Sequence, residues 1–189
     1  MDNENGAGLR KGRFILTGAP GAGKTAVVRQ LEIDGFAVVE EAATDVIALE
    51  QAKGVAEPWT DPGFIDRIVA LQRQRRLAAS GDVQFHDRSA LCTEALATFL
   101  GHPPSDLLLE EIAALKRSGF YDRRVFFVRL MGFIEATAAR RIGLEDARRF
   151  EEVHERTYRA HGFELVPVEP GSVVDRVAAI RRHLEAPSL

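Results

Sequence analysis

The segment from Gly18 to Thr25, with the sequence GAPGAGKT, carries residue types that bind polyphosphate. Glycines let backbone N–H groups curl around an anion, a lysine reaches the outer phosphates, and a threonine hydroxyl can ligate Mg²⁺. A plain glycine-rich turn would need neither the lysine nor the threonine, so the sequence predicts a nucleoside triphosphate site. The predicted nucleotide-binding residues are Gly18, Ala19, Pro20, Gly21, Ala22, Gly23, Lys24, Thr25 and Ala26.

Asp87 and Arg88 follow a short segment, residues 83–86, that is expected to be a strand. Ligands of open α/β sheets bind at the carboxyl ends of the strands. We therefore expect Asp87 to hold Mg²⁺ together with Thr25, and Arg88 to donate to a phosphate or a hydroxyl-bearing group of the substrate. The alternative is that Asp87 caps a helix and Arg88 lies beside it on the surface.

The second predicted strand ends in Glu40 and Glu41, so one or both carboxylates are also expected at the carboxyl edge of the sheet. A carboxylate beside a phosphate site can accept the proton of an attacking hydroxyl, so one of the two is a candidate general base. The alternative, in which both are favourable charges in the first turn of a helix, stays open. Asp45, one helical turn beyond Glu41, is a weaker candidate for binding a substrate hydroxyl.

Arg140 and Arg141 form a second arginine group, placed before a helix that is expected to start near residue 144. Such arginines can close over a transferring phosphate and neutralise the charge on its transition-state oxygens. Of the two, Arg141 is favoured. The charged residues of the following helix alternate in sign, which predicts a solvated face.

The remaining aromatic, cysteine and histidine residues give weaker signals. Trp59, Phe64 and Asp66 follow a connector at residues 54–62 that could line an acceptor pocket, although isolated aromatics are more often core residues. The single cysteine, Cys92, is expected to be a packed apolar residue. The five histidines have no metal-ligand spacing, and His154 is expected to be a packed or hydrogen-bonded helix residue.

Apolar runs alternate with segments of helical period along the whole chain. This alternation predicts an α/β fold, with a parallel sheet covered by helices on both faces. The predicted strands are residues 13–17, 36–40, 83–86, 125–129 and 163–168. The predicted helices are residues 24–33, 42–53, 61–80, 90–100, 105–118, a pair within 134–161, and 173–185.

Composition narrows the class of protein further. The chain has 189 residues, of which 46% are hydrophobic, and this suits one globular domain over residues 12–187 after a flexible start at 1–11. A net charge of -3 argues against a nucleic-acid partner. A lone cysteine, the absence of a basic-then-apolar leader and the absence of a long apolar run together predict a cytoplasmic protein that does not bind membranes.

With these residues in place, the chain resembles the small AAA-domain family of single-domain P-loop proteins, whose relatives include the kinase portion of nicotinamide riboside kinase proteins. The resemblance rests on residues 14–25, 38–43 with 46–47, 85–89, 140–142, 150–154 and 158–165. It implies a five-stranded core of order 2-3-1-4-5, ATP with Mg²⁺, and a lid that carries arginines. Residues 87–89 are also similar to the Asp/Glu-Arg-Ser motif of deoxynucleoside kinases, in which a glutamate after the second strand is the base.

These observations favour a kinase that transfers the ATP γ-phosphate to a hydroxyl of a nucleoside-like or other small molecule. One alternative is an ATPase or nucleotide-dependent switch that acts through a protein partner, which is disfavoured because Arg88 stands where motor ATPases carry a glutamate. A guanine-specific switch is excluded because the only asparagines are Asn3 and Asn5. Another alternative is a binding module without turnover. The acceptor, and whether the protein is a monomer or a homodimer, stay open.

Overall fold

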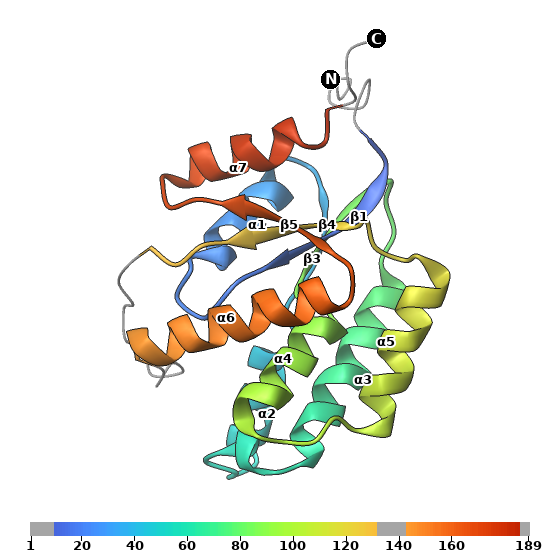
Figure 1. Ribbon diagram of the computed structural model, residues 1–189, viewed down its shortest axis with the longest axis vertical. Helices are drawn as coiled ribbons and strands as arrows, with labels where there is room; N and C mark the ends of the chain where they lie inside the picture. Colours follow the sequence, from blue (N-terminus) through green and yellow to red (C-terminus); the bar gives the residue numbers. More distant parts are fainter. Residues whose placement is uncertain (1–9, 132–142, 186–189) are drawn as a thin grey trace.

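The computed structural model describes residues 10–131 and 143–185. Five strands alternate with helices along the chain (Figure 1). The strands are β1 (Gly12–Thr17), β2 (Ala37–Val39), β3 (Val83–Asp87), β4 (Arg124–Val128) and β5 (Glu164–Val168). The helices are α1 (Lys24–Ile33), α2 (Ala43–Ala52), the short 3₁₀ turn η2 (Pro58–Thr60), α3 (Gly63–Ala78), α4 (Ala90–Leu100), α5 (Asp106–Ser118), α6 (Leu144–Ala160) and α7 (Val173–Arg182).

The strands form one parallel sheet of order β2-β3-β1-β4-β5, which confirms the predicted α/β class and strand order. The register places Leu16 beside Asp87, and Thr17 beside Phe127. The carboxyl end of β1 therefore lies between the ends of β3 and β4. Because the phosphate-binding loop continues from β1, the sheet brings Asp87 next to that loop.

The two faces of the sheet bury different residues of the same strand. In β1, Phe14 and Leu16 pack with α1 and α7, whereas Ile15 packs with the helices of the opposite face, and all three side chains are fully buried. Alternating burial of this kind is expected for a strand covered on both sides. Figure 1 shows α7 on one side of β4 and β5, and α4, α5 and α6 on the other.

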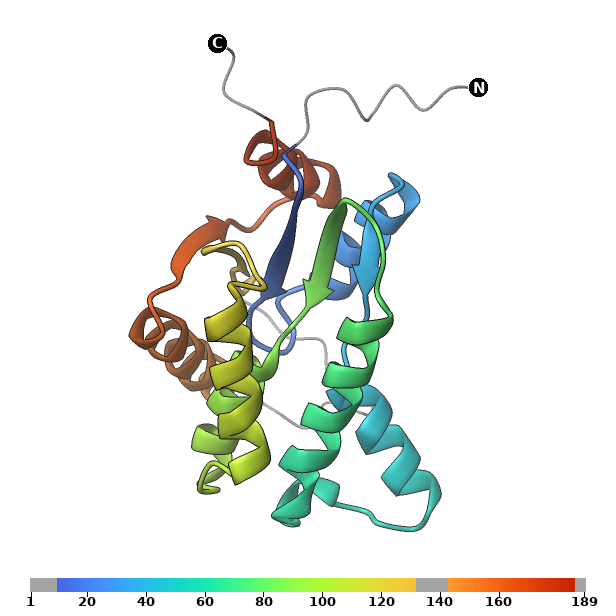
Figure 2. The ribbon, with the colours of Figure 1, turned by 90° about the vertical axis from the view of Figure 1, so that its right-hand side faces the viewer.

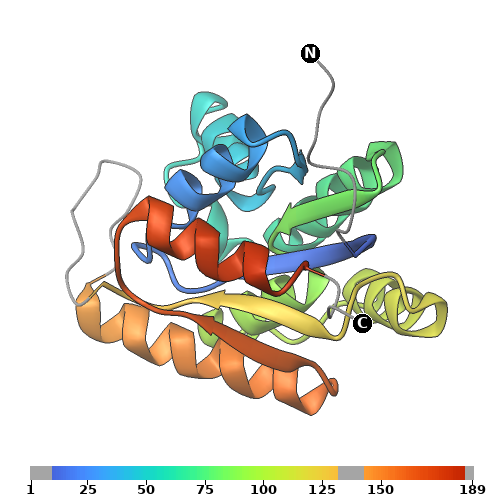
Figure 3. The ribbon, with the colours of Figure 1, turned by 90° about the horizontal axis from the view of Figure 1, so that it is seen from above.

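The helices also define the space around the strand ends. Figure 2 shows β1 and β3 pointing toward a region bounded by α2 and α3 on one side and by α4 and α5 on the other. Figure 3 shows α1 and α7 side by side over the sheet, where Arg181 of α7 pairs with Asp34 after α1 at 3.4 Å. The carboxyl ends of β1 and β3 therefore point between two pairs of helices.

Several element boundaries differ from the prediction. Strand β2 is shorter than residues 36–40, because the N–H of Phe36 bonds to the carbonyl of Leu31 and so belongs to the end of α1. The helix predicted over residues 61–80 begins at Gly63, whose N–H donates to the Asp61 carboxylate at 2.9 Å. The 3₁₀ turn was not predicted. Of the helix pair predicted within 134–161, the second member is α6, and residues 132–142 lie outside the described residues.

Among the helices of residues 10–131 and 143–185, none combines the length and the apolar character that spanning a bilayer requires.

Candidate active site

The phosphate-binding loop joins β1 to α1 and needs glycine at two crowded positions. At Gly18, where φ is 142°, a Cβ atom would lie 2.3 Å from the carbonyl oxygen of Val128 in β4. At Gly23, where φ is 80°, it would lie 2.9 Å from Nη1 of Arg176. Both positions combine a positive φ with close contact, so the loop keeps its shape only with glycine there.

The predicted loop residues occupy two layers. Pro20, Gly21, Gly23, Lys24 and Thr25 line a cleft at the carboxyl edge of the sheet. The side chains of Ala19 and Ala22 are fully buried behind the loop, so only their backbone faces a ligand, whereas Ala26 is exposed in the first turn of α1. The spatial arrangement agrees with a loop that binds anions through its backbone.

Arg176 of α7 holds the loop from behind. Its guanidinium donates to three backbone carbonyls, those of Ala22 at 2.9 Å, Arg129 at 2.9 Å and Glu169 at 3.1 Å, and the residue is 3% exposed. The contacts tie the loop to the ends of β4 and β5. No local sequence pattern indicates Arg176, because its partners are backbone groups of three separate segments.

Lys24 lies buried at the start of α1. Its ammonium donates to the carbonyls of Gly18 at 2.9 Å and Ala19 at 3.0 Å, within the loop itself. Burial and the nearby positive charge of Arg88 lower the pKa of Lys24 to about 8, although Asp87 and Glu41 oppose the shift. An anion bound in the loop would favour the charged lysine and oppose this desolvation.

Asp87 and Thr25 present the oxygen atoms that a hard cation requires. The Oδ1 atom of Asp87 is buried without a hydrogen-bond partner among the described residues, and burial raises the pKa of this carboxyl group despite the charge of Lys24. An unpartnered buried carboxylate oxygen and a threonine that lines the same cleft fit Mg²⁺, which takes few protein ligands and completes its shell with phosphates and water. The described part of the chain contains no cluster of three histidine, cysteine, aspartate or glutamate residues that could hold a metal alone.

The alternative role of Asp87 as a helix cap is wrong. Helix α4 begins at Ala90, and its N-cap residue is Ser89, whereas Asp87 is the last residue of β3. Between them Arg88 adopts a φ of 75°, the single positive φ of a non-glycine residue in the described chain. Such a conformation in a bulky residue costs of order 1–3 kcal/mol and persists only where surrounding contacts hold it, as at many functional sites.

Arg88 is held by Glu41 across the sheet edge. Its Nε atom lies 2.6 Å from Oε1 of Glu41, and the Thr44 hydroxyl donates to the other carboxylate oxygen at 3.0 Å. Burial alone would raise the pKa of Glu41, but the charges of Arg88 and Lys24 outweigh it, so this pKa lies below the usual glutamate value. Glu41 is therefore ionised at neutral pH and faces the cleft.

The structure separates Glu41 from Glu40. Glu40 is exposed and does not line the cleft. It borders, with Asp45, a smaller hollow that adjoins the cleft at Thr25, Glu41 and Asp87. Arg75 of α3, which the sequence analysis missed, donates to the backbone carbonyls of Glu40 and Glu41 and pairs with the Asp45 carboxylate. Helix α3 thus fixes the segment that carries Glu41, and Asp45 is engaged in the same contact.

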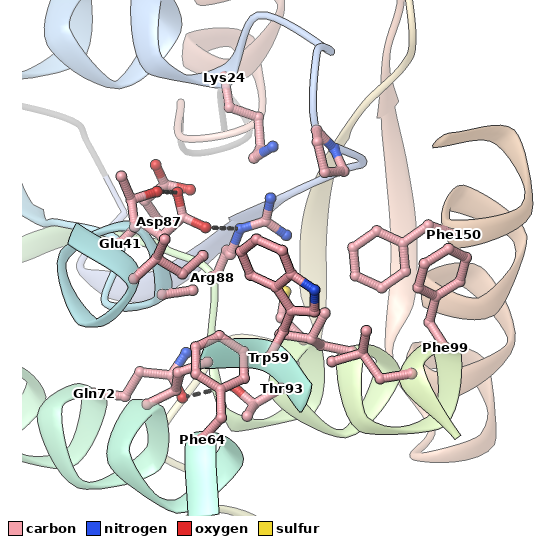
Figure 4. Close-up of a pocket in the computed structure, with 18 of the residues that line it drawn as sticks. Lys24, Glu41, Trp59, Phe64, Gln72, Asp87, Arg88, Thr93, Phe99 and Phe150 are labelled. Atoms are coloured by element: carbon pink, nitrogen blue, oxygen red, sulfur yellow. Dashed lines mark hydrogen bonds and ion pairs between the residues drawn. The ribbon is translucent and has the colours of Figure 1, made fainter. Parts of the chain in front are cut away.

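The cleft has a volume of about 390 Å³ and two chemically different ends. Figure 4 shows Glu41, Asp87 and Arg88 close together below Lys24, with aromatic rings beyond Arg88. The apolar end is lined by Ile47, Trp59, Phe64, Ile68, Leu96, Phe99, Leu100 and Phe150. A phosphate site therefore opens into a pocket suited to a small ring-bearing molecule.

The structure also places the weaker candidates of the sequence. Trp59 and Phe64 line the cleft as expected, but Asp66 does not, and it accepts a hydrogen bond from the Ser105 hydroxyl instead. Cys92 is 2% exposed, as expected for a packed residue, and its sulfur lies 2.8 Å from the Thr17 hydroxyl. The predicted lid with Arg140 and Arg141 lies outside the described residues.

The strand order, together with the phosphate-binding loop that follows the central strand β1, defines a kinase-like P-loop fold. The chain belongs to the AAA domain family, whose model matches residues 13–176. No curated protein sequence matches the chain.

Solved structures of three proteins share the fold. One is a NadR protein in complex with NR, with a TM-score of 0.65 and 15% identity over 95% of this chain. Another is deoxyadenosine kinase from M. mycoides with bound dCTP, with a TM-score of 0.61 and 14% identity over 91% of this chain and 98% of that chain. The third is shikimate kinase from Acinetobacter baumannii in complex with shikimate, with a TM-score of 0.53 and 16% identity over 92% of this chain and 91% of that chain.

The present chain covers 53% of the NadR chain and so spans about half of its length. A second NadR structure, with NAD and AMP-PNP bound, has a TM-score of 0.64 and 17% identity over 95% of this chain, and this chain covers 52% of it. At these identities the likeness shows the fold alone.

Proposed function

We propose that the protein is a kinase that transfers the γ-phosphate of ATP to a hydroxyl group of a small nucleoside-like molecule. The observation that supports this proposal most strongly is that one cleft combines a phosphate-binding end with an apolar end that could hold an acceptor. Its polar end carries the phosphate-binding loop with Lys24, and its apolar end is lined by rings such as Trp59 and Phe64. Glu41 and Arg88 lie between the two ends.

The residues can share the reaction as follows. The loop backbone and Lys24 hold the phosphates, and the ionised Glu41 accepts a hydrogen bond from the acceptor hydroxyl and later its proton. The hydroxyl oxygen bonds to the γ-phosphorus, the bond to the bridging oxygen breaks, and ADP leaves. Arg88 neutralises charge on the transferring group. Mg²⁺, held by Thr25 and Asp87, would neutralise charge on the phosphate oxygens of ATP.

The similar structures support this proposal without identifying the acceptor. Deoxyadenosine kinase and shikimate kinase share the fold, and a NadR structure holds AMP-PNP. Simple ATP hydrolysis fits the cleft less well. The residue after Asp87 is an arginine paired with Glu41, and the apolar end is much larger than a water molecule needs.

The test is a screen of the purified chain with Mg²⁺, ATP and a library of nucleosides and other small hydroxyl compounds. A ligand at about 100 times its dissociation constant stabilises the protein by about 2.7 kcal/mol, so thermal shifts will identify binders. We expect at least one binder to accelerate ADP formation and to gain one phosphoryl group, as seen by mass spectrometry. Hydrolysis of ATP that no library member accelerates would contradict the kinase assignment and support an ATPase.

A further inference from the structure

We propose that His154, a buried residue of α6, is a positioning residue that holds the Arg88 guanidinium at a different nitrogen from the one that Glu41 contacts. The Nε2 atom of His154 lies 3.4 Å from Nη1 of Arg88, while Glu41 lies 2.6 Å from the Nε atom of the same guanidinium. The guanidinium is thus held by side chains from two different elements, α6 and the segment after β2. Its position in the cleft depends on both.

The other nitrogen of His154 determines which tautomer the ring adopts. Nδ1 lies 2.9 Å from the carbonyl oxygen of Phe150, and a carbonyl can only accept, so Nδ1 carries the proton. In a neutral ring Nε2 then has a free lone pair. That lone pair faces an arginine N–H group, which can only donate, so the two contacts of the ring are mutually consistent.

The surroundings of the ring keep it neutral. His154 is fully buried, and burial together with the positive charge of Arg88 lowers the pKa of His154 to about 3. A protonated ring would direct an N–H group at the guanidinium N–H groups and would add a second positive charge. His154 does not line the cleft, so it cannot reach a substrate hydroxyl as a general base.

The contact belongs to a regular face of α6. Phe150, His154 and Tyr158 follow one another at intervals of four residues and therefore lie on one side of the helix. Phe150 lines the cleft, and the Tyr158 hydroxyl lies 2.9 Å from the Ser89 hydroxyl. Three successive turns of α6 thus contact the cleft, Arg88 and the residue after it.

This arrangement accounts for the backbone of Arg88. The residue has a φ of 75°, and its N–H donates to the Leu16 carbonyl at 3.0 Å, which fixes the chain at the end of β3. The side-chain contacts with Glu41 and His154 hold the other end of the residue. The inference rests on the proposed kinase function only for what Arg88 does to a phosphate, and the position of the guanidinium is testable by itself.

The first measurement uses the wild-type chain. Long-range ¹H–¹⁵N spectra of histidine-labelled protein at about pH 7 report the tautomer of each ring. We expect one histidine signal of the neutral Nδ1–H form that disappears in His154→Gln. A ring protonated at Nε2 would overturn the proposal, whether or not any variant folds.

The second measurement compares variants through the Nε–H signal of Arg88, which is assigned by its loss in Arg88→Lys. His154→Leu removes the nitrogen that accepts from Nη1 of Arg88, whereas His154→Gln places an amide oxygen near the former Nε2 position. We expect the exchange of this proton with water to accelerate by about tenfold or more in the leucine variant and by less than about threefold in the glutamine variant. Ile112→Ala, a buried change on α5 away from the cleft, controls for lost stability and should leave the exchange unchanged.

The third measurement is ATP turnover with the acceptor that the screen identifies. We expect His154→Leu to lower kcat by about tenfold or more with the KM for ATP within about twofold, and His154→Gln to recover most of kcat. Equal defects in the leucine and glutamine variants, or an Arg88 signal in His154→Leu like that of wild type, would overturn the role of His154. A wild-type protein without acceptor-dependent turnover would instead refute the kinase function, while the spectra still decide the role of His154.

Discussion

The Nε atom of Arg88 lies 2.6 Å from Oε1 of Glu41, so an ion pair joins the carboxyl ends of the neighbouring strands β3 and β2. The pair stands at the junction of the polar and apolar ends of the cleft. Both side chains are largely withdrawn from solvent, so the contact has consequences for each of them. The pair keeps Glu41 ionised, and Glu41 in turn keeps the guanidinium facing the phosphate-binding loop.

The ion pair leads to a test that separates the two candidate bases. Glu41→Gln should lower kcat by about 10²–10⁴-fold, the range for loss of a general base, while the dissociation constant for ATP stays within about twofold. Glu40→Gln is the matched control, because Glu40 is exposed and does not line the cleft, and we expect near wild-type turnover. If steady-state kinetics show a larger loss of kcat in Glu40→Gln than in Glu41→Gln, Glu40 is the general base.

The lowered pKa of Lys24 leads us to expect that the protein takes up a proton when ATP binds. Its pKa in the free protein is about 8, and a bound polyphosphate favours the charged form and raises that pKa. At about pH 8.5 binding should therefore take up roughly 0.5–0.8 proton, and at about pH 6.5 almost none from this group. ATP affinity should fall as the pH rises above about 8.

Isothermal titration calorimetry in buffers of different ionisation enthalpy measures this uptake. Lys24→Arg supplies the control, because an arginine stays charged throughout the range and should abolish the difference between buffers at high pH. Equal apparent enthalpies in all buffers for the wild-type protein at about pH 8.5 would refute the shifted pKa.

The contacts of Arg176 indicate that α7 supports nucleotide binding by holding the phosphate-binding loop. Arg176→Met leaves three backbone carbonyls without their donor, and each unsatisfied buried group costs about 1–3 kcal/mol. We expect ATP to bind about tenfold more weakly, with a lower melting temperature, because the loop loses its support behind Ala22. Arg181→Met, on the same helix and more exposed, should leave ATP binding unchanged. Equal ATP affinities of the two variants would contradict this role.

Trp59 offers a direct probe of the acceptor end. It is the single tryptophan of the chain, and it lines the cleft. Binding of the acceptor should therefore change the intrinsic fluorescence. Trp59→Ala should raise the KM for the acceptor by about tenfold or more while the KM for ATP changes little, and Trp59→Phe should retain most of the affinity. A larger rise in the KM for ATP than in the KM for the acceptor would show that the two ends of the cleft have been assigned in reverse.

Local patterns predicted most of the fold. The apolar runs of β1 and β4 and the helical periods between strands lie within single segments, so sequence spacing alone reveals them. The predicted range of the edge strand β2 was too long. The hydrogen bond from the N–H of Phe36 to the carbonyl of Leu31 depends on how α1 ends, and residue types do not reveal it. The exact limits of elements are set by such backbone contacts rather than by residue type.

The sequence by itself determined the phosphate-binding loop and the α/β class, because glycines, Lys24 and Thr25 act through their spacing along one short segment. Only the tertiary structure decided that Glu41 rather than Glu40 faces the cleft, and that Arg176 and His154 support the site. These relationships depend on which way a side chain points and on partners from distant elements. Parallel pairing of all five strands, in the order β2-β3-β1-β4-β5, brings those elements together, and no local sequence pattern records these contacts.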